Sequence, residues 1–194
     1  LRAEAAGITA RGSKSFYFAT RFFPQPLAES AHAVYWFCRH TDDLVDEAPS
    51  PEVGHVQIED WARAVETALR TGEASHPILV LFLDAVHRHG IPHENPLELI
   101  EGMRMDLRRT RYRTFAELRV FCYRVASVVG LMMSHVIGFH GPALGHAADL
   151  GIAMQLTNIL RDLSLVLRDE WVDPVQTQLA PLRIRVAGIA AGRG

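Results

Sequence analysis

Apolar residues recur at steps of three and four through most of this chain, and no segment alternates with the two-residue period of a half-buried strand. The pattern is clearest over residues 26–46, where one stripe contains Leu27, Ala31, Val34, Cys38, Thr41 and Val45. Proline, glycine and capping residues bound further expected helices over residues 52–70, 77–89, 95–107, 114–138 and 142–171. The sequence therefore predicts an all-α fold.

Length and composition favour one domain with an ordinary buried core. The chain has 194 residues, of which 48% are hydrophobic and 22% charged, and its net charge of −2 gives no electrostatic basis for binding nucleic acid. Cys38 and Cys122 both lie in apolar helical patterns, which favours buried free thiols in a reducing compartment over a disulfide. The longest apolar stretch, residues 125–139, is too short to span a bilayer. Residues 172–194 show little helical periodicity and are an atypical tail with no assigned role.

An acidic cluster lies at residues 42–46, inside the strongest predicted helix. Asp42 and Asp46 are four residues apart, so their carboxylates project from one face of that helix, a single turn apart. Like charges in this arrangement repel each other unless a cation lies between them. Mg²⁺ prefers oxygen ligands and commonly uses one or two protein carboxylates together with substrate phosphates. The pair is a candidate site for a divalent cation.

A second polar stripe lies in the last predicted helix. Its members are spaced by three, three and one residues among apolar neighbours, and they are Gln155, Asn158, Arg161 and Asp162. A buried polar stripe is costly unless its members satisfy each other or a ligand. Two such stripes on two helices favour a helical bundle whose interior holds a ligand.

Four segments, in order, resemble the motifs of the squalene/phytoene synthase family. They lie at residues 13–17 (Ser-Lys-Ser-Phe-Tyr), 35–46, 121–130 and 155–162, and the resemblance covers about residues 10–165. Several independent motifs in the same order are far more specific than any one of them. The resemblance implies an isoprenoid synthase-type helical bundle around a central apolar cavity, here a single incomplete domain that lacks the C-terminal helices.

The implied reaction is head-to-head condensation of two prenyl diphosphates, most like that of bacterial phytoene synthase. Two geranylgeranyl diphosphates would give phytoene through a cyclopropylcarbinyl diphosphate, with Mg²⁺, or alternatively Mn²⁺, as the metal. A squalene or dehydrosqualene type of enzyme, using farnesyl diphosphate, is the alternative, and NADPH would be needed only for the squalene type. The family also implies a cytoplasmic protein, with peripheral association at the inner membrane for release of the product. The oligomeric state stays open.

The resemblance also implies roles for individual residues. Metal ligands would be Asp42, Asp46, Asn158 and Asp162. The diphosphate would be contacted by Ser13, Arg39 and Arg161. Tyr35, Tyr123 and Gln155 would lie in the reaction chamber near it, and Phe16 would help to position the substrate.

Two departures from the family pattern set limits on that reading. The second acidic motif normally continues to another aspartate one turn after the first, and this position is Val166, which cannot bind a metal ion. Ser127 replaces a glycine that is usual in the central motif, and a side chain there could crowd close helix packing. Two further readings thus stand beside the synthase: a catalytically impaired chain that binds prenyl diphosphate or pairs with another subunit, and a helical scaffold whose polar stripes are structural.

Overall fold

The computed structural model describes residues 1–108 and 111–166, with the side chains of 163–166 excepted. These residues form α-helices and one π-helical turn, in the order α1 (Arg2–Gly12), α2 (Lys14–Thr20), α3 (Gln25–Asp46), α4 (Pro51–Thr71), α5 (Pro77–His89), α6 (Glu94–Arg108), α7 (Phe115–Cys122), η1 (Tyr123–Ser127), α8 (Val128–Ile137) and α9 (Ala143–Val166). No strand occurs among them. The prediction of an all-α fold is confirmed for this part of the chain.

The predicted helices correspond to α3 to α9, and α5 has the predicted bounds. The predicted end of the last helix, near residue 171, lies outside the described residues. Helices α1 and α2 were not predicted. The sequence of α1 is rich in alanine and glycine, so its buried stripe consists only of Ala5 and Thr9 and gives a weak periodic signal.

The chain divides into two units, residues Leu1–Gln155 and Leu156–Gly194. The first contains α1 to α8 and the first part of α9, while the described part of the second is residues 156–166, the remainder of α9. Each unit is described by itself.

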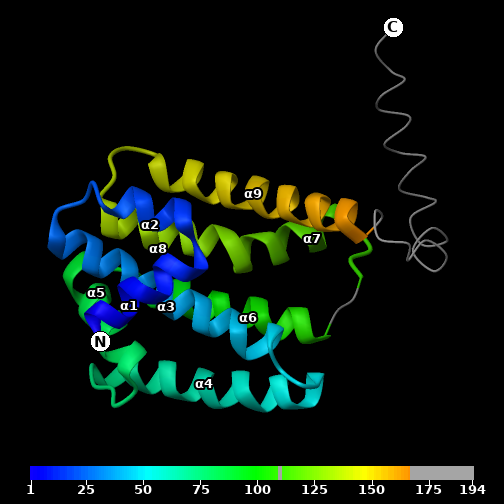
Figure 1. Ribbon diagram of the computed structural model, residues 1–194. Coiled ribbons are helices and arrows are strands. Elements are labelled where there is room, and N and C mark those ends of the chain that lie inside the picture. The colour runs from blue at the N-terminus through cyan, green and yellow to red at the C-terminus, as the bar shows by residue number, and fades with distance from the viewer. Residues whose placement is uncertain (109–110, 167–194) are drawn as a thin grey trace, which may run out of the picture. The chain divides into compact units, whose positions relative to one another are not determined.

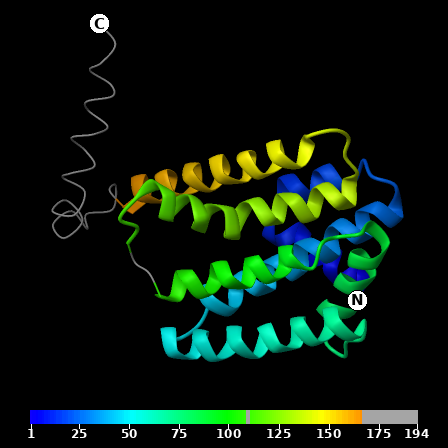
Figure 2. The same ribbon diagram turned by 180° about the vertical axis from the view of Figure 1, so that it is seen from behind.

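Helix α3 is the centre of the first unit and packs against α1, α4, α5, α6 and α8. Helices α4 and α6 run side by side next to it (Figures 1 and 2). Phe37 of α3 is fully buried, and its ring stacks on that of Phe82 with centroids 3.9 Å apart. Burying a side chain of this size contributes about 1.5–3 kcal/mol. The Trp61 ring of α4 lies 5.9 Å from that of Phe37, and its indole N–H donates to Thr41 Oγ1 at 3.0 Å, so α4 is fixed against α3 by both apolar and polar contacts.

The helix predicted over residues 114–138 is continuous but contains the π-turn η1. Thr114 caps its start, because its hydroxyl oxygen accepts the Glu117 backbone N–H at 3.2 Å. Helix α6 packs tightly on this turn at Gly102, where an added Cβ would lie 2.9 Å from Val125 Cγ1. A side chain at Gly102 would thus push the two helices apart.

Ser127 is accommodated at the crossing of η1 with the first part of α9. It is fully buried, and its hydroxyl donates to the Ala148 carbonyl oxygen at 2.5 Å. The facing residue is Gly151, where an added Cβ would lie only 2.4 Å from Ser127 Cα. The departure from the family's usual glycine is therefore tolerated, because the opposite helix has a glycine and an available carbonyl.

The two cysteines, Cys38 and Cys122, are free and buried, as predicted. One helical run in the described residues, Phe115–Ile137, has the length and composition to cross a membrane, although a core helix passes the same test. The sequence prediction considered only the apolar stretch of residues 125–139, which begins later than this helical run. Glu117, Arg119 and Arg124 interrupt the apolar sequence before residue 125, but they do not interrupt the helix.

Candidate active site

The last turns of α3 carry two acidic stripes with different surroundings. In the first, Arg39 lies one turn before Asp43, and its Nη2 is 2.6 Å from Asp43 Oδ1 and 3.8 Å from Glu47 Oε1. The second stripe contains Asp42 and Asp46, and neither makes an ion pair in the described part of the chain. Asp43 is thus compensated by a neighbouring cation, while Asp42 and Asp46 face each other with like charge.

The unfavourable electrostatic surroundings act mainly on the carboxyl group of Asp42. Burial raises the pKa of its carboxyl from the ordinary 3.8 to about 7, and the Asp46 charge adds to the rise, while Arg39 opposes it. A partly buried carboxylate with a raised pKa binds a proton or a cation readily. This property marks Asp42 as a functional candidate on physical grounds.

A third carboxylate, Asp106 of α6, joins the pair and was missed in the sequence. Its side chain reaches solvent, yet the surrounding protein and the Asp46 charge raise its pKa. One signal could have found it: Leu99 and Met103 are buried on α6, and Asp106 follows at the next step of the same apolar stripe. A charge at such a position needs a reason, and the neighbouring α3 carboxylates supply one.

The three carboxylates are chemically suited to bind a hard divalent cation. Carboxylate oxygens are the ligands that Mg²⁺ takes, and a cation would relieve the repulsion among Asp42, Asp46 and Asp106. The described side chains do not by themselves converge into a group of three metal ligands. One or two carboxylates completed by substrate oxygens and water is a common arrangement for this ion.

An aromatic wall lies one helical turn before Arg39 along α3. The ring of Tyr35 stacks on Phe16 of α2 with centroids 5.5 Å apart. Tyr35 also covers the end of α1, because a Cβ added at Gly12 would lie 2.3 Å from its hydroxyl oxygen. Burial raises the pKa of Tyr35, so its hydroxyl keeps its proton as a donor. Ser13 caps α2 by accepting the Phe16 N–H at 3.4 Å. The structure thus brings Ser13, Phe16 and Tyr35 together.

Tyr123 lies on η1 and lines a different space, a pocket of about 830 Å³. Its walls come from α6, α7, η1 and the first part of α9, and they are Glu98, Phe115, Ala116, Arg119, Val120, Tyr123, Arg124 and Ile152. Most of this lining is apolar, but neither Asp42 nor Asp46 contributes to it, so it does not test the predicted reaction chamber. Gln155, the last residue of the first unit, is half-buried on α9 and does not line the pocket.

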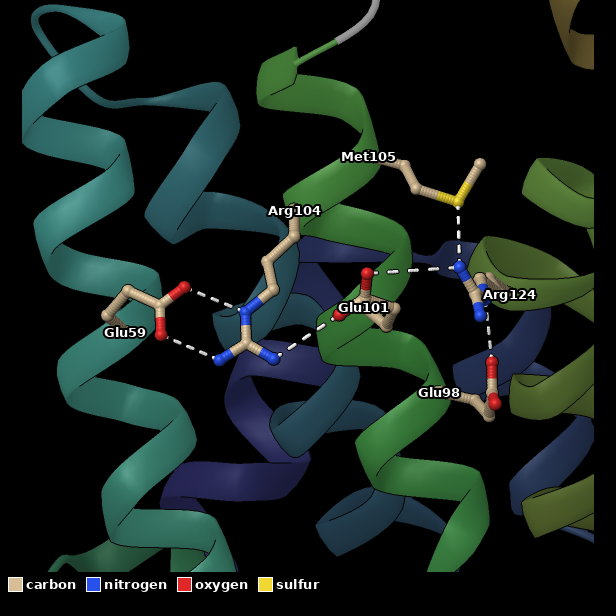
Figure 3. A network of polar contacts seen from close by, with 6 residues as sticks. All are labelled: Glu59, Glu98, Glu101, Arg104, Met105 and Arg124. Atoms are coloured by element: carbon tan, nitrogen blue, oxygen red, sulfur yellow. Dashed lines mark hydrogen bonds and ion pairs between the residues drawn. The ribbon is translucent and has the colours of Figure 1, made fainter.

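A network of ion pairs fixes α6 between α4 and η1 (Figure 3). Arg104 binds both carboxylate oxygens of Glu59, through Nε at 2.8 Å and Nη2 at 2.7 Å, and reaches Glu101 at 3.3 Å. Arg124 donates to Glu98 at 2.7 Å and lies 3.9 Å from Glu101. This network sets the register of α6, which carries Asp106, against η1, which carries Tyr123.

The remaining predicted site residues, Asn158, Arg161 and Asp162, belong to the second unit. Asn158 and Asp162 lie one helical turn apart on α9, and Arg161 Nε is 3.4 Å from Asp162 Oδ1. Because each unit is described by itself, the pairing of this cluster with Asp42 and Asp46 stays a prediction.

Comparisons with known proteins agree with the fold and the motifs. The sequence profile of the family described as Squalene/phytoene synthase matches residues 9–172. The 15-cis-phytoene synthase of Synechococcus elongatus is 37% identical over 173 residues, which is 82% of this chain and 56% of that protein. Phytoene synthase 1 of Arabidopsis thaliana, a chloroplastic protein, is 33% identical over 193 residues, covering 96% of this chain and 46% of its own length.

Two solved structures share the fold. A dehydrosqualene synthase crystallised with a ligand superposes with a TM-score of 0.72 at 32% identity, over 82% of this chain and 56% of that one. The squalene synthase HpnC from Alicyclobacillus acidocaldarius gives 0.75 at 26% identity, over 86% and 63%. The chain spans about half the length of the relatives that it matches in sequence. With an isoprenoid synthase fold and a match over most of its residues, the chain belongs to the squalene/phytoene synthase family.

Proposed function

We propose that this chain is a prenyltransferase that condenses two prenyl diphosphates head to head. The observation that carries the proposal is the set of uncompensated carboxylates Asp42, Asp46 and Asp106 in a member of this family, with the Asp42 charge acting on Tyr35 of the Phe16–Tyr35 aromatic wall. Uncompensated carboxylates beside aromatic rings suit a substrate with a diphosphate head and an apolar tail. A helical bundle does not need uncompensated carboxylates beside aromatic rings for its stability.

In this proposal the residues of α3 and α2 act on the diphosphate end of the donor. Asp42 and Asp46 would hold Mg²⁺, with Mn²⁺ as a substitute, and Asn158 and Asp162 would supply further ligands from the second acidic cluster. The metal would neutralise the diphosphate and favour its departure. Ser13, Arg39 and Arg161 would contact the diphosphate oxygens, for which the guanidinium geometry is well suited.

The apolar and aromatic side chains would protect the allylic cation. Water must be excluded from the chamber, because it would capture that cation before the second substrate could. Phe16, Tyr35 and Tyr123 provide aromatic faces, which also favour a nearby cation. Gln155 would lie near the departing diphosphate.

We favour geranylgeranyl diphosphate as the substrate and phytoene as the product. The support is the set of sequence relatives, whose names include phytoene synthases of cyanobacterial and plant origin. Farnesyl diphosphate is the second candidate, motivated by the two structural neighbours named as dehydrosqualene and squalene synthases. NADPH would be required only for a squalene-type product.

A second function is motivated by Val166, which stands where the resemblance expects a carboxylate. A chain that lacks this ligand could bind a prenyl diphosphate without turning it over. In that case the chain would act as a binding protein or as a subunit of a larger assembly. Such a chain would still require Asp42 and Asp46 for binding that depends on Mg²⁺.

One experiment separates these functions. The purified chain and a Val166→Asp variant are incubated with geranylgeranyl or farnesyl diphosphate and Mg²⁺, with and without NADPH, and pyrophosphate and hydrocarbon products are measured. Phytoene from the unmodified chain supports the synthase. Saturable binding without product, together with product from Val166→Asp, supports the impaired binding protein. If neither protein binds or consumes either substrate, both proposals are wrong.

A further inference from the structure

Gly12 is the last residue of α1, and its backbone conformation does not require a glycine. It is not among the glycines with a positive φ, so an L side chain could follow the same backbone path. The residue is exposed, so the lack of a side chain does not serve the packing of the core. Glycine in a helix also lowers stability relative to alanine. The structure offers a different reason for glycine at this position, which is a close contact with α3.

The contact is with the hydroxyl group of Tyr35. A Cβ added at Gly12 would lie 2.3 Å from the Tyr35 hydroxyl oxygen, and 3.3 and 3.4 Å from Cζ and Cε1 of the ring. Non-bonded heavy atoms pack best at about 3.5–4.0 Å, so a side chain at residue 12 would push the hydroxyl away by about 1 Å. The ring atoms would need to move much less. The end of α1 is thus a backbone wall behind this one oxygen atom.

Other contacts of Tyr35 leave the reach of its hydroxyl to this wall. The Phe16 ring stacks on the ring of Tyr35 with an interplanar angle of 20°, which restrains motion across the ring plane but not within it. Within the described part of the chain, no hydrogen bond holds the Tyr35 hydroxyl. Contact with Gly12 therefore sets how far the hydroxyl extends, and leaves its proton available to a ligand.

The wall itself is held firmly on α3. Helix α1 packs against both α2 and α3, and Ala5 and Thr9 are the residues that it buries. At the other end of α1, Arg2 Nη1 lies 2.9 Å from Glu29 Oε2 of α3. Because α1 is fixed along its length, a side chain added at its last residue would displace the hydroxyl rather than the helix.

We propose that Gly12 is a positioning residue, whose missing side chain sets where the Tyr35 hydroxyl lies at the candidate active site. The inference rests on the proposed function, in which Tyr35 lies near the diphosphate. The charges of Arg39, Asp43 and Asp42 act on Tyr35, so its hydroxyl is within electrostatic reach of the acidic end of α3. A misplacement of about 1 Å can lower a rate on the order of a hundredfold when it moves a group out of line with the reacting atoms.

The test compares Gly12→Ala with Gly7→Ala, the same substitution in the same helix. A Cβ at Gly7 would lie 3.5 Å from Arg11 Nη1, which is an ordinary contact. With geranylgeranyl diphosphate and Mg²⁺, Gly12→Ala should lower kcat for pyrophosphate release by about tenfold to a hundredfold and change KM by less than about threefold. Gly7→Ala should change neither. Both variants should unfold at or above the midpoint of the unmodified chain, because alanine favours the helix.

Removal of the hydroxyl makes the test specific to Tyr35. In Tyr35→Phe, the atom that the new Cβ would meet most closely is gone. Adding Gly12→Ala to Tyr35→Phe should therefore lower kcat by less than about twofold further, so that the two losses do not multiply. A glycine that served only the fold of this corner would lower kcat by the same factor in both backgrounds, and that result would overturn the proposal.

A second readout needs no turnover. The chain has four tyrosines, so the ring signal of Tyr35 in ¹³C-tyrosine-labelled protein can be assigned by its loss in Tyr35→Phe. Gly12→Ala should move this signal, and Gly7→Ala should leave it in place. Mg²⁺ with geranylgeranyl diphosphate should shift it in the unmodified chain and shift it much less in Gly12→Ala.

The two readouts separate failure of this inference from failure of the proposed reaction. If the unmodified chain makes no product, the reaction is wrong, while the position of the Tyr35 signal still decides the role of Gly12. A Tyr35 signal that does not move in Gly12→Ala would overturn the inference. So would a signal that moves while kcat and the response to the ligand stay unchanged, because the contact would then have no bearing on the site.

Discussion

Helix α6 carries carboxylates in its first half and near its end, and their surroundings have opposite charge. Glu98 and Glu101, in its first half, are matched by Arg124 and Arg104 at distances of 2.7 and 3.3 Å. Asp106, near its end, faces Asp46 instead and has a raised pKa. The first arrangement fixes helices to one another. The second costs free energy in the absence of a cation and marks the candidate site.

The same contrast recurs within a single turn of α3. Asp43 is held by Arg39, whereas Asp42, its neighbour in sequence, has a pKa raised to about 7. An acidic motif is therefore not uniform in its chemistry. The carboxylates to examine for function are those that the fold leaves without a matching cation.

The largest expected effect separates Asp42 from Asp43. Asp42→Asn or Asp46→Asn should lower the rate of pyrophosphate release on the order of a thousandfold, because each removes a proposed metal ligand. Asp43→Asn, the matched control one position away, should lower it by less than about tenfold. If the chain binds prenyl diphosphate without turning it over, calorimetry of that binding in the presence of Mg²⁺ should rank the three variants in the same order. Equal losses in all three variants would contradict the distinction.

The next effect concerns the compensated half of α6. Arg104→Met should lower the free energy of unfolding by about 2 kcal/mol, since it leaves Glu59 without its partner and Glu101 with only Arg124, 3.9 Å away, in a half-buried network. Hydrogen bonds from Arg104 lower the pKa of Glu59, so this contribution is present above the ordinary carboxylate pKa and is lost as pH falls through the folded value. Urea unfolding near neutral pH and again near pH 3 checks both statements. A difference that stays constant with pH would argue against the ion pair as the cause.

A smaller effect, of opposite sign, is expected for Asp42. Its folded pKa lies above the unfolded value, so the folded state binds more protons and loses stability as pH rises from the ordinary 3.8 to about 7. Asp42→Asn should therefore stabilise the metal-free protein by about 1–2 kcal/mol above that range and have little effect below it. Unfolding midpoints across pH measure this difference, and added Mg²⁺ should reduce it. Destabilisation by Asp42→Asn at high pH would overturn the interpretation.

The smallest effect is expected where ion pairs lie in solvent. Arg88→Ala removes a pair with Asp84 at 2.8 Å, and Arg63→Ala removes a pair with Asp60; all four side chains are well exposed. Each variant should change the free energy of unfolding by less than about 0.5 kcal/mol. A loss as large as that for Arg104→Met would show that burial does not distinguish the network on α6 from ordinary surface pairs.

Periodicity predicted the helices that bury a wide apolar stripe, such as α3 and α5, because packing and sequence spacing agree there. It missed α1, whose small side chains leave little pattern, and the π-turn η1, which packs closely against α6 at Gly102. Spacing within one helix also identified Asp42 and Asp46. Asp106 could not be joined to them, because that proximity depends on how α6 packs against α3 and not on any local spacing.

The contact between Ser127 and Gly151 has a consequence for how this chain can vary. A Cβ at residue 151 would lie 2.4 Å from Ser127 Cα and 2.7 Å from its backbone nitrogen, so the clash is with the backbone as well as with the serine side chain. Gly151 is therefore required whichever residue stands at position 127. Among descendants of this sequence, Ser127 should persist or revert to glycine freely, while Gly151 should remain unchanged even after such a reversion.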